Sequence, residues 1–155
     1  MQLNKFNSIL SVVCALTFLS SCDTLSKIQN VWVDSVDITV DRDANNDSAT
    51  SIDLVFLFKK ELVDEVSKLT SHDYYRRVDQ LVRDNPKLIQ IVRWELAPGQ
   101  YLPNEKIKGV EGTPLAGIIF ASYSTPGDHR VILGLQRNLD IHLMANDFFV
   151  SEKLK

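Results

Sequence analysis

The feature that most constrains the fold is a nearly continuous apolar run at residues 52–58 (IDLVFLF). A run of strand length between polar segments fits a strand at the centre of a β-sandwich better than a helix. The preceding residues 31–40 alternate with a period of two, which would place Trp32, Val36 and Ile38 on one face. Because the segment is rich in Val and Ile, this alternation predicts a half-buried strand. The chain is therefore expected to form its core between β-sheets.

The remaining segments predict that the sandwich carries a helical insertion. Apolar residues recur at helical spacing over residues 62–82, Ser71 is a suitable N-cap, and Asn85-Pro86 ends the pattern. The other expected elements are a polar loop at 42–51, strands at 88–96, 115–123, 130–135 and 139–144, and a long connecting loop at 97–113. This order predicts a mainly β fold, a small two-sheet β-sandwich with a short helical insertion.

The N-terminus has the pattern of an export signal. Lys5 precedes a largely apolar run at residues 9–19, which is too short to span a bilayer, and the sequence LSSC follows at residues 19–22. This order predicts a lipoprotein signal peptide at 1–21, with lipid attached to Cys22 as the first residue of the mature chain. A tether at 22–30 and a β-sandwich domain at 31–155 would follow. The alternative is an ordinary signal peptide cut nearby, with Cys22 as a free thiol.

Composition excludes several classes of function. The formal net charge of the whole chain is −3, and loss of the signal peptide would remove Lys5 but no acid, so binding to nucleic acid is not expected. Cys14 would leave with the signal peptide and Cys22 would be lipidated, which leaves no thiol for catalysis or disulfides. His72, His129 and His142 form no HExxH pattern, and the sequence has no GxSxG, SxxK or phosphate-binding loop. We expect no enzyme activity and no cofactor.

Two segments allow more than one interpretation. Residues 41–47 (DRDANND) offer oxygen ligands at alternate positions, as a calcium loop does, but position 12 of such a loop would be Ile52. The alternative is a polar loop whose Asp and Asn side chains stabilise local turns, and no metal site is predicted. In the helical insertion, Tyr74 and Tyr75 are expected to pack in the core. An exposed tyrosine beside the following arginines could instead belong to an interface.

The order of the segments resembles that of the TssJ lipoproteins of type VI secretion systems. The resemblance rests on LSSC at 19–22, SIDLVFLF at 51–58, SHDYY and DQL at 71–75 and 79–81, WELAPG at 94–99, and GIIFASY at 117–123. Each motif is short, but together they span most of the mature chain.

The resemblance implies a transthyretin-like β-sandwich with a structural role. Such a lipoprotein binds the periplasmic C-terminal region of the inner-membrane protein TssM through the loop between its first two strands. The implied partner-binding residues are Asp41, Asp43, Asn45, Asn46, Asp47 and Ser48. The family implies an anchor in the outer membrane, facing the periplasm, whereas Asp23 resembles an inner-membrane retention signal. The alternative function is a lipid-anchored periplasmic module that binds a small ligand or calcium.

Overall fold

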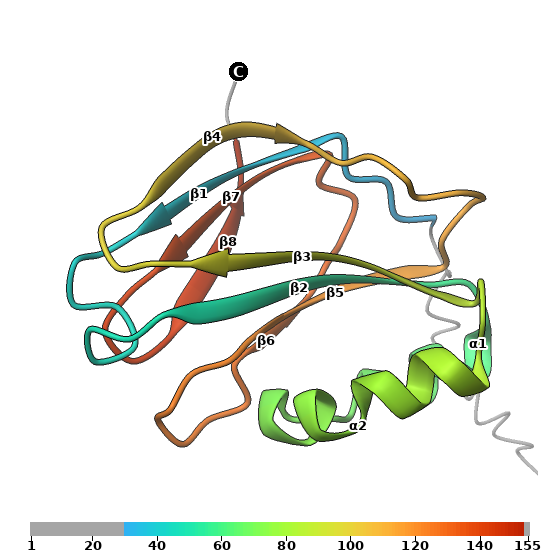
Figure 1. The fold of residues 1–155 in the computed structure, drawn as a ribbon. Coiled ribbons are helices and arrows are strands. Elements are labelled where there is room, and N and C mark those ends of the chain that lie inside the picture. Colours follow the sequence, from blue (N-terminus) through green and yellow to red (C-terminus); the bar gives the residue numbers. More distant parts are fainter. Residues whose placement is uncertain (1–29, 154–155) are drawn as a thin grey trace, which may run out of the picture.

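Two four-stranded sheets pack face to face in the computed structural model, and two helices cover the outside of one of them (Figure 1). The model describes residues 30–153, so the predicted signal peptide, Cys22 and most of the tether lie outside the described residues. The strands are β1 (Ser35–Val40), β2 (Thr50–Leu57), β3 (Ile89–Leu96), β4 (Tyr101–Lys106), β5 (Ala116–Ala121), β6 (Arg130–Ile132), β7 (Asn138–Leu143) and β8 (Phe148–Glu152). The helices α1 (Lys60–Val66) and α2 (Ser71–Asp84) connect β2 to β3. The predicted two-sheet β-sandwich with a helical insertion is confirmed.

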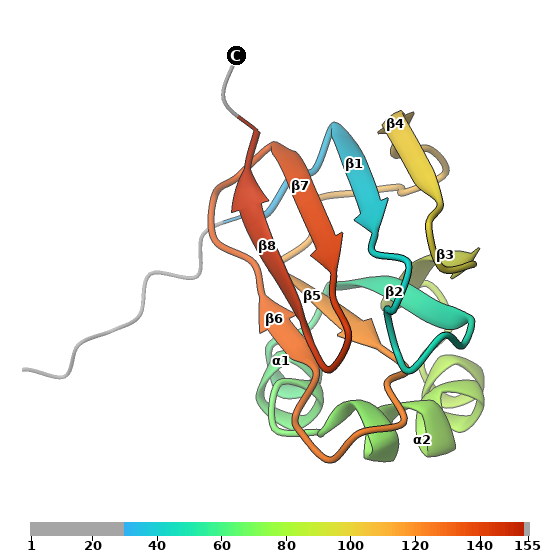
Figure 2. The ribbon, with the colours of Figure 1, turned by 90° about the vertical axis from the view of Figure 1, so that its left-hand side faces the viewer.

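The two sheets divide the chain in an interleaved way. One sheet has the strand order β4-β1-β7-β8 and the other has the order β3-β2-β5-β6. All neighbouring strands are antiparallel except β1 and β7, which pair in parallel from Ser35 opposite Asn138 to Val40 opposite Leu143. Figure 2 shows the first sheet above the second, with both helices below the second sheet, on its side away from the first. Among the described residues, no helix is long and apolar enough to cross a membrane.

Strand β2 is buried on both of its faces. Leu54 and Phe56 point into the core between the sheets, whereas Val55 and Leu57 point into a second core beneath the helices. The helices close this second core with Val66, Tyr74 and other apolar residues spaced one helical turn apart. Burial on both sides explains why this strand reads as an uninterrupted apolar run rather than as an alternating one.

Both tyrosines of α2 are fixed against the sheet. Thr70 caps the helix by accepting a hydrogen bond from the backbone of Asp73, one residue before the expected cap at Ser71. The ring of Tyr74 stacks on Phe120 with 4.1 Å between ring centroids. The half-buried Tyr75 donates its hydroxyl hydrogen to the backbone oxygens of residues 51 and 120. The pair therefore packs in the core, and neither hydroxyl is free for an interface.

A charged group lies inside this apolar layer. Asp53 of β2 is fully buried and accepts two hydrogen bonds from the Arg93 guanidinium, at 2.6 and 2.5 Å, and one from the Tyr74 hydroxyl at 2.7 Å. Burial and the neighbouring carboxylate raise the pKa of Tyr74, so its phenol remains a donor. The hydrogen bonds to Asp53 raise the pKa of Arg93. The three side chains thus tie β2, β3 and α2 together.

Three expectations about the strands are wrong. The predicted loop at 97–113 contains β4, and a further strand, β8, follows the last predicted one. Both lie at the edges of their sheet, and β4 carries Pro103 and mostly exposed side chains, so it lacks the alternation of a half-buried strand. Trp32 does not share a face with Val36, because Val31 and Val33 point into the core and leave the indole 43% exposed.

The first prediction concerns the buried carboxylate. Replacing Tyr74 by Phe keeps the ring stacked on Phe120 but removes one donor from Asp53. We expect Tyr74→Phe to lower the free energy of unfolding by about 1.5–3 kcal/mol, the range for hydrogen bonds to charged groups. Urea denaturation with an unchanged m-value would measure it. A loss no larger than that of Tyr75→Phe, which affects only bonds to backbone oxygens, would contradict this account.

The second prediction concerns Asp37 on β1. Its carboxylate accepts hydrogen bonds from the Lys153 ammonium at 2.7 Å and the Asn104 backbone at 3.2 Å. The Lys153 bond chiefly lowers the pKa of Asp37. Since the folded-state pKa lies below the unfolded value of about 3.9, the stabilisation is complete above that value and is lost as the pH falls through the folded-state pKa.

We therefore expect the unfolding free energy of the wild type to fall more steeply below about pH 4 than that of Asp37→Asn. Denaturant titrations over a pH series would measure both slopes. Lys153→Met, which removes the donor, should flatten the acid dependence in the same way. Parallel curves for all three proteins would show that this pair does not contribute.

Candidate interaction surface

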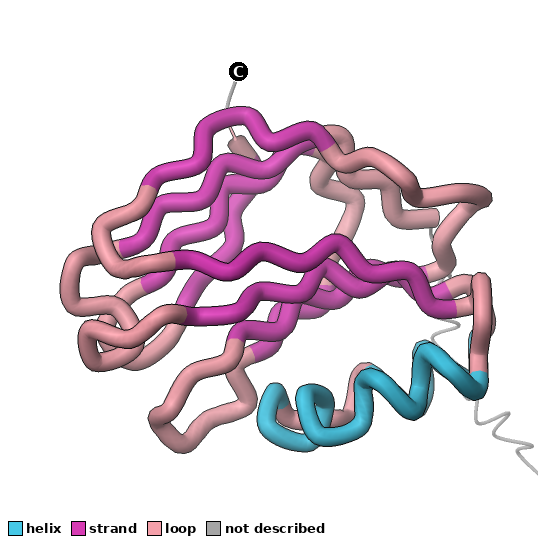
Figure 3. Tube along the Cα trace, viewed as in Figure 1, coloured by secondary structure: helices cyan, strands magenta, loops and turns pink. Residues whose placement is uncertain are grey.

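Four loops meet at one end of the sandwich (Figure 3, left). They are the β1–β2 loop (41–49), the β3–β4 loop (97–100), the β5–β6 loop (122–129) and the β7–β8 loop (144–147). Backbone hydrogen bonds join three of them: Asp41 donates to Leu143 at 2.9 Å, Gly99 donates to Asp41 at 3.2 Å, and Asn45 donates to Met144 at 3.4 Å. The side chain of Asn45 joins the fourth, the β5–β6 loop. This end is therefore a connected surface rather than four separate loops.

The β1–β2 loop adopts a strained but well-suited backbone conformation. Three consecutive residues, Asn45, Asn46 and Asp47, have positive φ angles of 48°, 54° and 58°. Asn and Asp tolerate this left-handed region better than most other residues. The backbone of Ala44 also donates to Asp41 at 3.2 Å, which closes the first turn of the loop. The polar, small composition of this segment thus encodes a specific turn.

Asn45 anchors the loop to the body of the sandwich. Its side chain is 3% exposed, and its amide nitrogen donates to the backbone oxygens of Ala49 and Ser122 at 3.2 and 3.3 Å. Its amide oxygen accepts hydrogen bonds from the backbone and the hydroxyl of Ser124, at 2.8 and 3.0 Å. Because these bonds use the whole amide, Asn45 positions the loop and does not present a free group to a partner.

The other expected contact residues lie at the surface. Asp43, Asn46, Asp47 and Ser48 are exposed. Asp41 is partly exposed and lies 2.7 Å from the Nε2 atom of His142 on β7. The loop thus presents acidic and amide groups on a fixed backbone, together with the carboxylate of Asp41 at its base. The sequence predicts all six residues as contacts, and only the fold separates the buried Asn45 from the exposed ones.

A second anchor in this region was missed from the sequence. His129 is 7% exposed, with Nδ1 at 3.0 Å from the Asp147 carboxylate and Nε2 at 2.8 Å from the backbone oxygen of Thr125. Its ring stacks on Tyr123, whose hydroxyl donates to the backbone oxygens of Met144 and Asp147. Burial raises the pKa of Tyr123. These contacts hold the β5–β6 and β7–β8 loops together, and no spacing in the sequence links them.

The loop does not gather a ligand set for a metal ion. Within residues 30–153, no three His, Cys, Asp or Glu side chains are close enough to one another to hold one. Asn45, one of the oxygen-bearing side chains of the possible calcium loop, is already bonded to Ser122 and Ser124. The arrangement is that of the alternative interpretation, in which Asn and Asp stabilise local turns.

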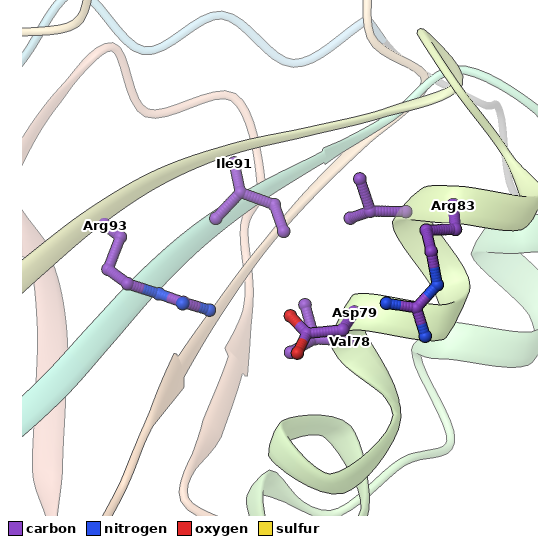
Figure 4. Close-up of a pocket in the computed structure, with 6 residues that line it drawn as sticks. Val78, Asp79, Arg83, Ile91 and Arg93 are labelled. Atoms are coloured by element: carbon purple, nitrogen blue, oxygen red, sulfur yellow. The ribbon is translucent and has the colours of Figure 1, made fainter.

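The surface also has a hollow of about 420 Å³ between α2 and β3 (Figure 4). Val78, Val82 and Ile91 provide its apolar lining, and Asp79, Arg83 and Arg93 its charged groups. It is wide open to solvent, and the Arg93 guanidinium already binds Asp53 through two of its nitrogens. A small-molecule site usually encloses most of its ligand, so this hollow does not favour the ligand-binding alternative.

Comparison with known proteins identifies the fold. No family model matches the chain, and no curated protein matches it significantly. Several solved structures are similar to it, of which three are described. TssJ1, a type VI secretion lipoprotein of Pseudomonas aeruginosa, has a TM-score of 0.54 and 14% identity, over 82% of this chain and 98% of that chain. Lip, a membrane-bound component of the Serratia marcescens type VI secretion system, has a TM-score of 0.54 and 16% identity, over 78% and 96%.

The third structure is a chain of a type VI membrane complex, with a TM-score of 0.52 and 14% identity, over 77% of this chain and 98% of that chain. All three neighbours are covered almost completely, so the similarity includes both sheets and not a fragment. The resemblance predicted from the sequence motifs is confirmed at the level of the fold: this chain has the β-sandwich fold of the TssJ lipoproteins.

Proposed function

We propose that the chain is a lipid-anchored structural component of a type VI secretion membrane complex. In this proposal its β1–β2 loop binds the periplasmic C-terminal domain of a TssM-like inner-membrane protein. The observation that carries the proposal is an acidic loop held rigidly at one end of a TssJ-like sandwich. The protein acts by binding and assembly, and no catalytic step is part of its role.

The geometry of the loop supports recognition by a preorganised surface. Asn45 and the backbone bonds to the neighbouring loops fix the exposed residues before a partner arrives. Fixing a loop in advance lowers the entropy lost on binding. The exposed carboxylates of Asp43 and Asp47 would accelerate encounter with a partner surface that carries Lys or Arg, and would select its orientation.

We assign the membrane anchor to Cys22 and the protein to the periplasm. The export signal, the LSSC sequence and the TssJ-like fold support this assignment. The outer membrane is the proposed location on the basis of the family. Asp23 makes the inner membrane the alternative, and fractionation of the two membranes separates them.

The third prediction tests the loop. We expect the double variant Asp43→Asn/Asp47→Asn to raise the Kd for the purified TssM-like domain about fivefold, because an exposed charge contributes about 0.5 kcal/mol and two of them about 1 kcal/mol. Isothermal titration at low and moderate salt would measure it, and the difference should shrink as salt rises. The matched control, Glu61→Gln/Glu111→Gln, removes the same charge away from the loop. Equal losses in both double variants would contradict a specific role of the loop.

A deletion of the loop would be a poor test, because it would also remove the anchor. Asn45→Ala should lower the free energy of unfolding by about 2–3 kcal/mol, since it leaves buried backbone groups without partners. Asp43→Asn/Asp47→Asn keeps that anchor and should leave the unfolding midpoint unchanged. Comparing the two variants separates loss of contact from loss of loop structure.

The fourth prediction tests the anchor. Cys22→Ala removes the only residue to which lipid is expected to be attached, so the protein should move from the membrane fraction to the soluble or precursor fraction. Fractionation followed by mass spectrometry of the N-terminal peptide would measure this. A wild-type N-terminal peptide that carries an unmodified thiol would support the ordinary signal peptide instead.

A further inference from the structure

Three large apolar side chains are exposed around the first described residues of the chain. Trp32 is 43% exposed, Ile132 is 54% exposed and Leu135 is 58% exposed. Trp32 lies just before β1, Ile132 is the last residue of β6, and Leu135 lies in the connection from β6 to β7. We call these three residues the Trp32 patch.

The two segments that carry the patch lie side by side. The backbone of Asp34 donates to the oxygen of Arg137 at 2.7 Å. The side chains of Val31 and Leu133 both lie against Gly117, 3.1 and 3.0 Å from the position that a Cβ would take there. Residues 31–34 and 133–137 therefore run along each other at the edge of the core.

The alternation of these segments explains why Trp32 and Ile132 point outward. Val31 and Val33 are buried in the core between the sheets, so Trp32 between them turns to the surface. Leu133 is buried in the same core, which places its neighbour Ile132 on the opposite side of the chain. The core of the sandwich thus requires Val31, Val33 and Leu133 to be apolar, but it does not require the exposed positions 32 and 132 to be apolar.

The position of the patch relates it to the predicted anchor. Cys22 precedes Asn30 by eight residues, which span at most about 29 Å even when fully extended. Trp32 follows two residues later, so the patch is at the end of the domain where the anchored chain enters. The acidic β1–β2 loop begins at the other end of β1 (Figure 1, left).

We propose that the Trp32 patch contacts the surface of the bilayer that carries the lipid anchor. This proposal rests on the proposed lipidation of Cys22. An indole ring is well suited to the membrane interface, where its apolar body and its N–H group both find favourable surroundings. Beside the patch, the side chains of Asp34 and Arg137 form an ion pair at 3.0 Å, so this pair adds no net charge where the patch would meet the headgroups.

The contact would also orient the domain. With the patch on the bilayer, the acidic loop at the opposite end of β1 points away from anionic headgroups and toward the periplasm.

Tryptophan fluorescence can test the contact directly. The chain has two tryptophans, so Trp94→Phe leaves Trp32 as the only one. The lipidated full-length product of this variant is placed on vesicles of phosphatidylethanolamine and phosphatidylglycerol, with or without brominated acyl chains. We expect the brominated lipid to quench Trp32 and its emission maximum to shift to shorter wavelength. Emission equal on the two kinds of vesicle would overturn the proposal.

A position control and a separate anchor keep the result interpretable. The control carries Trp32→Phe, Trp94→Phe and Tyr101→Trp. Its single indole then lies at the position of Tyr101, which is 58% exposed in the wild type and far from the patch. We expect the brominated lipid not to quench this indole. A mature chain held on nickel-chelating lipid by a histidine tag in place of Cys22 repeats the measurement without native lipidation. Quenching only in this form would show that the lipid on Cys22 does not place the patch on the bilayer, and would overturn the proposal.

Absence of quenching in both anchored forms would refute the patch while leaving lipidation to be judged by mass spectrometry. If Trp32 emission changes only when the TssM-like domain is added, the patch binds protein and the bilayer proposal is wrong. Leu135→Ser in the single-tryptophan background should reduce the quenching of Trp32, because it removes a neighbouring apolar contact with the bilayer. An unchanged signal would exclude Leu135 from the contact.

Discussion

Strand β2 lies between two apolar layers, so most of its side chains make their contacts inside the protein. For the apolar residues this is simple, because the opposite sheet and the helices supply the contacts. Asp53 is the exception, and its buried charge is tolerated only because Arg93 and Tyr74 donate to it. The helical insertion is thus more than a cover, since it brings the Tyr74 hydroxyl to a charge that the sheet alone would leave partly unsatisfied.

Strong local patterns made the centre of the fold predictable. The apolar run of β2, the helical spacing before Asn85-Pro86 and the short strands that follow gave the sandwich and its insertion. The edge strands β4 and β8 were missed because an edge strand has fewer buried positions and little periodicity. The predicted orientation of Trp32 was wrong because the core-facing residues change from odd numbers, up to Val33, to even numbers, from Val36 on. The sequence pattern alone does not reveal this change.

The candidate surface was predictable in composition but not in detail. The polar residues 41–48 were identified from the sequence, yet Asn45 is buried and its neighbours are exposed. That distinction depends on Ser122 and Ser124, which are far away in the sequence and adjacent only after folding. The second anchor, formed by His129, Tyr123 and Asp147, could not be predicted from the sequence for the same reason. Its members come from two loops that only tertiary contacts bring together.

The parallel pairing of β1 with β7 has a consequence for the order of folding. These strands lie near opposite ends of the described chain, and β1 has only β4 and β7 as neighbours. Closing so long a loop is slow, because its entropic cost precedes the contacts that compensate it. During synthesis from the N-terminus, β1 can complete its pairing only after β4 and residues 138–143 of β7 have both been made. We therefore expect this sheet to be completed late in folding.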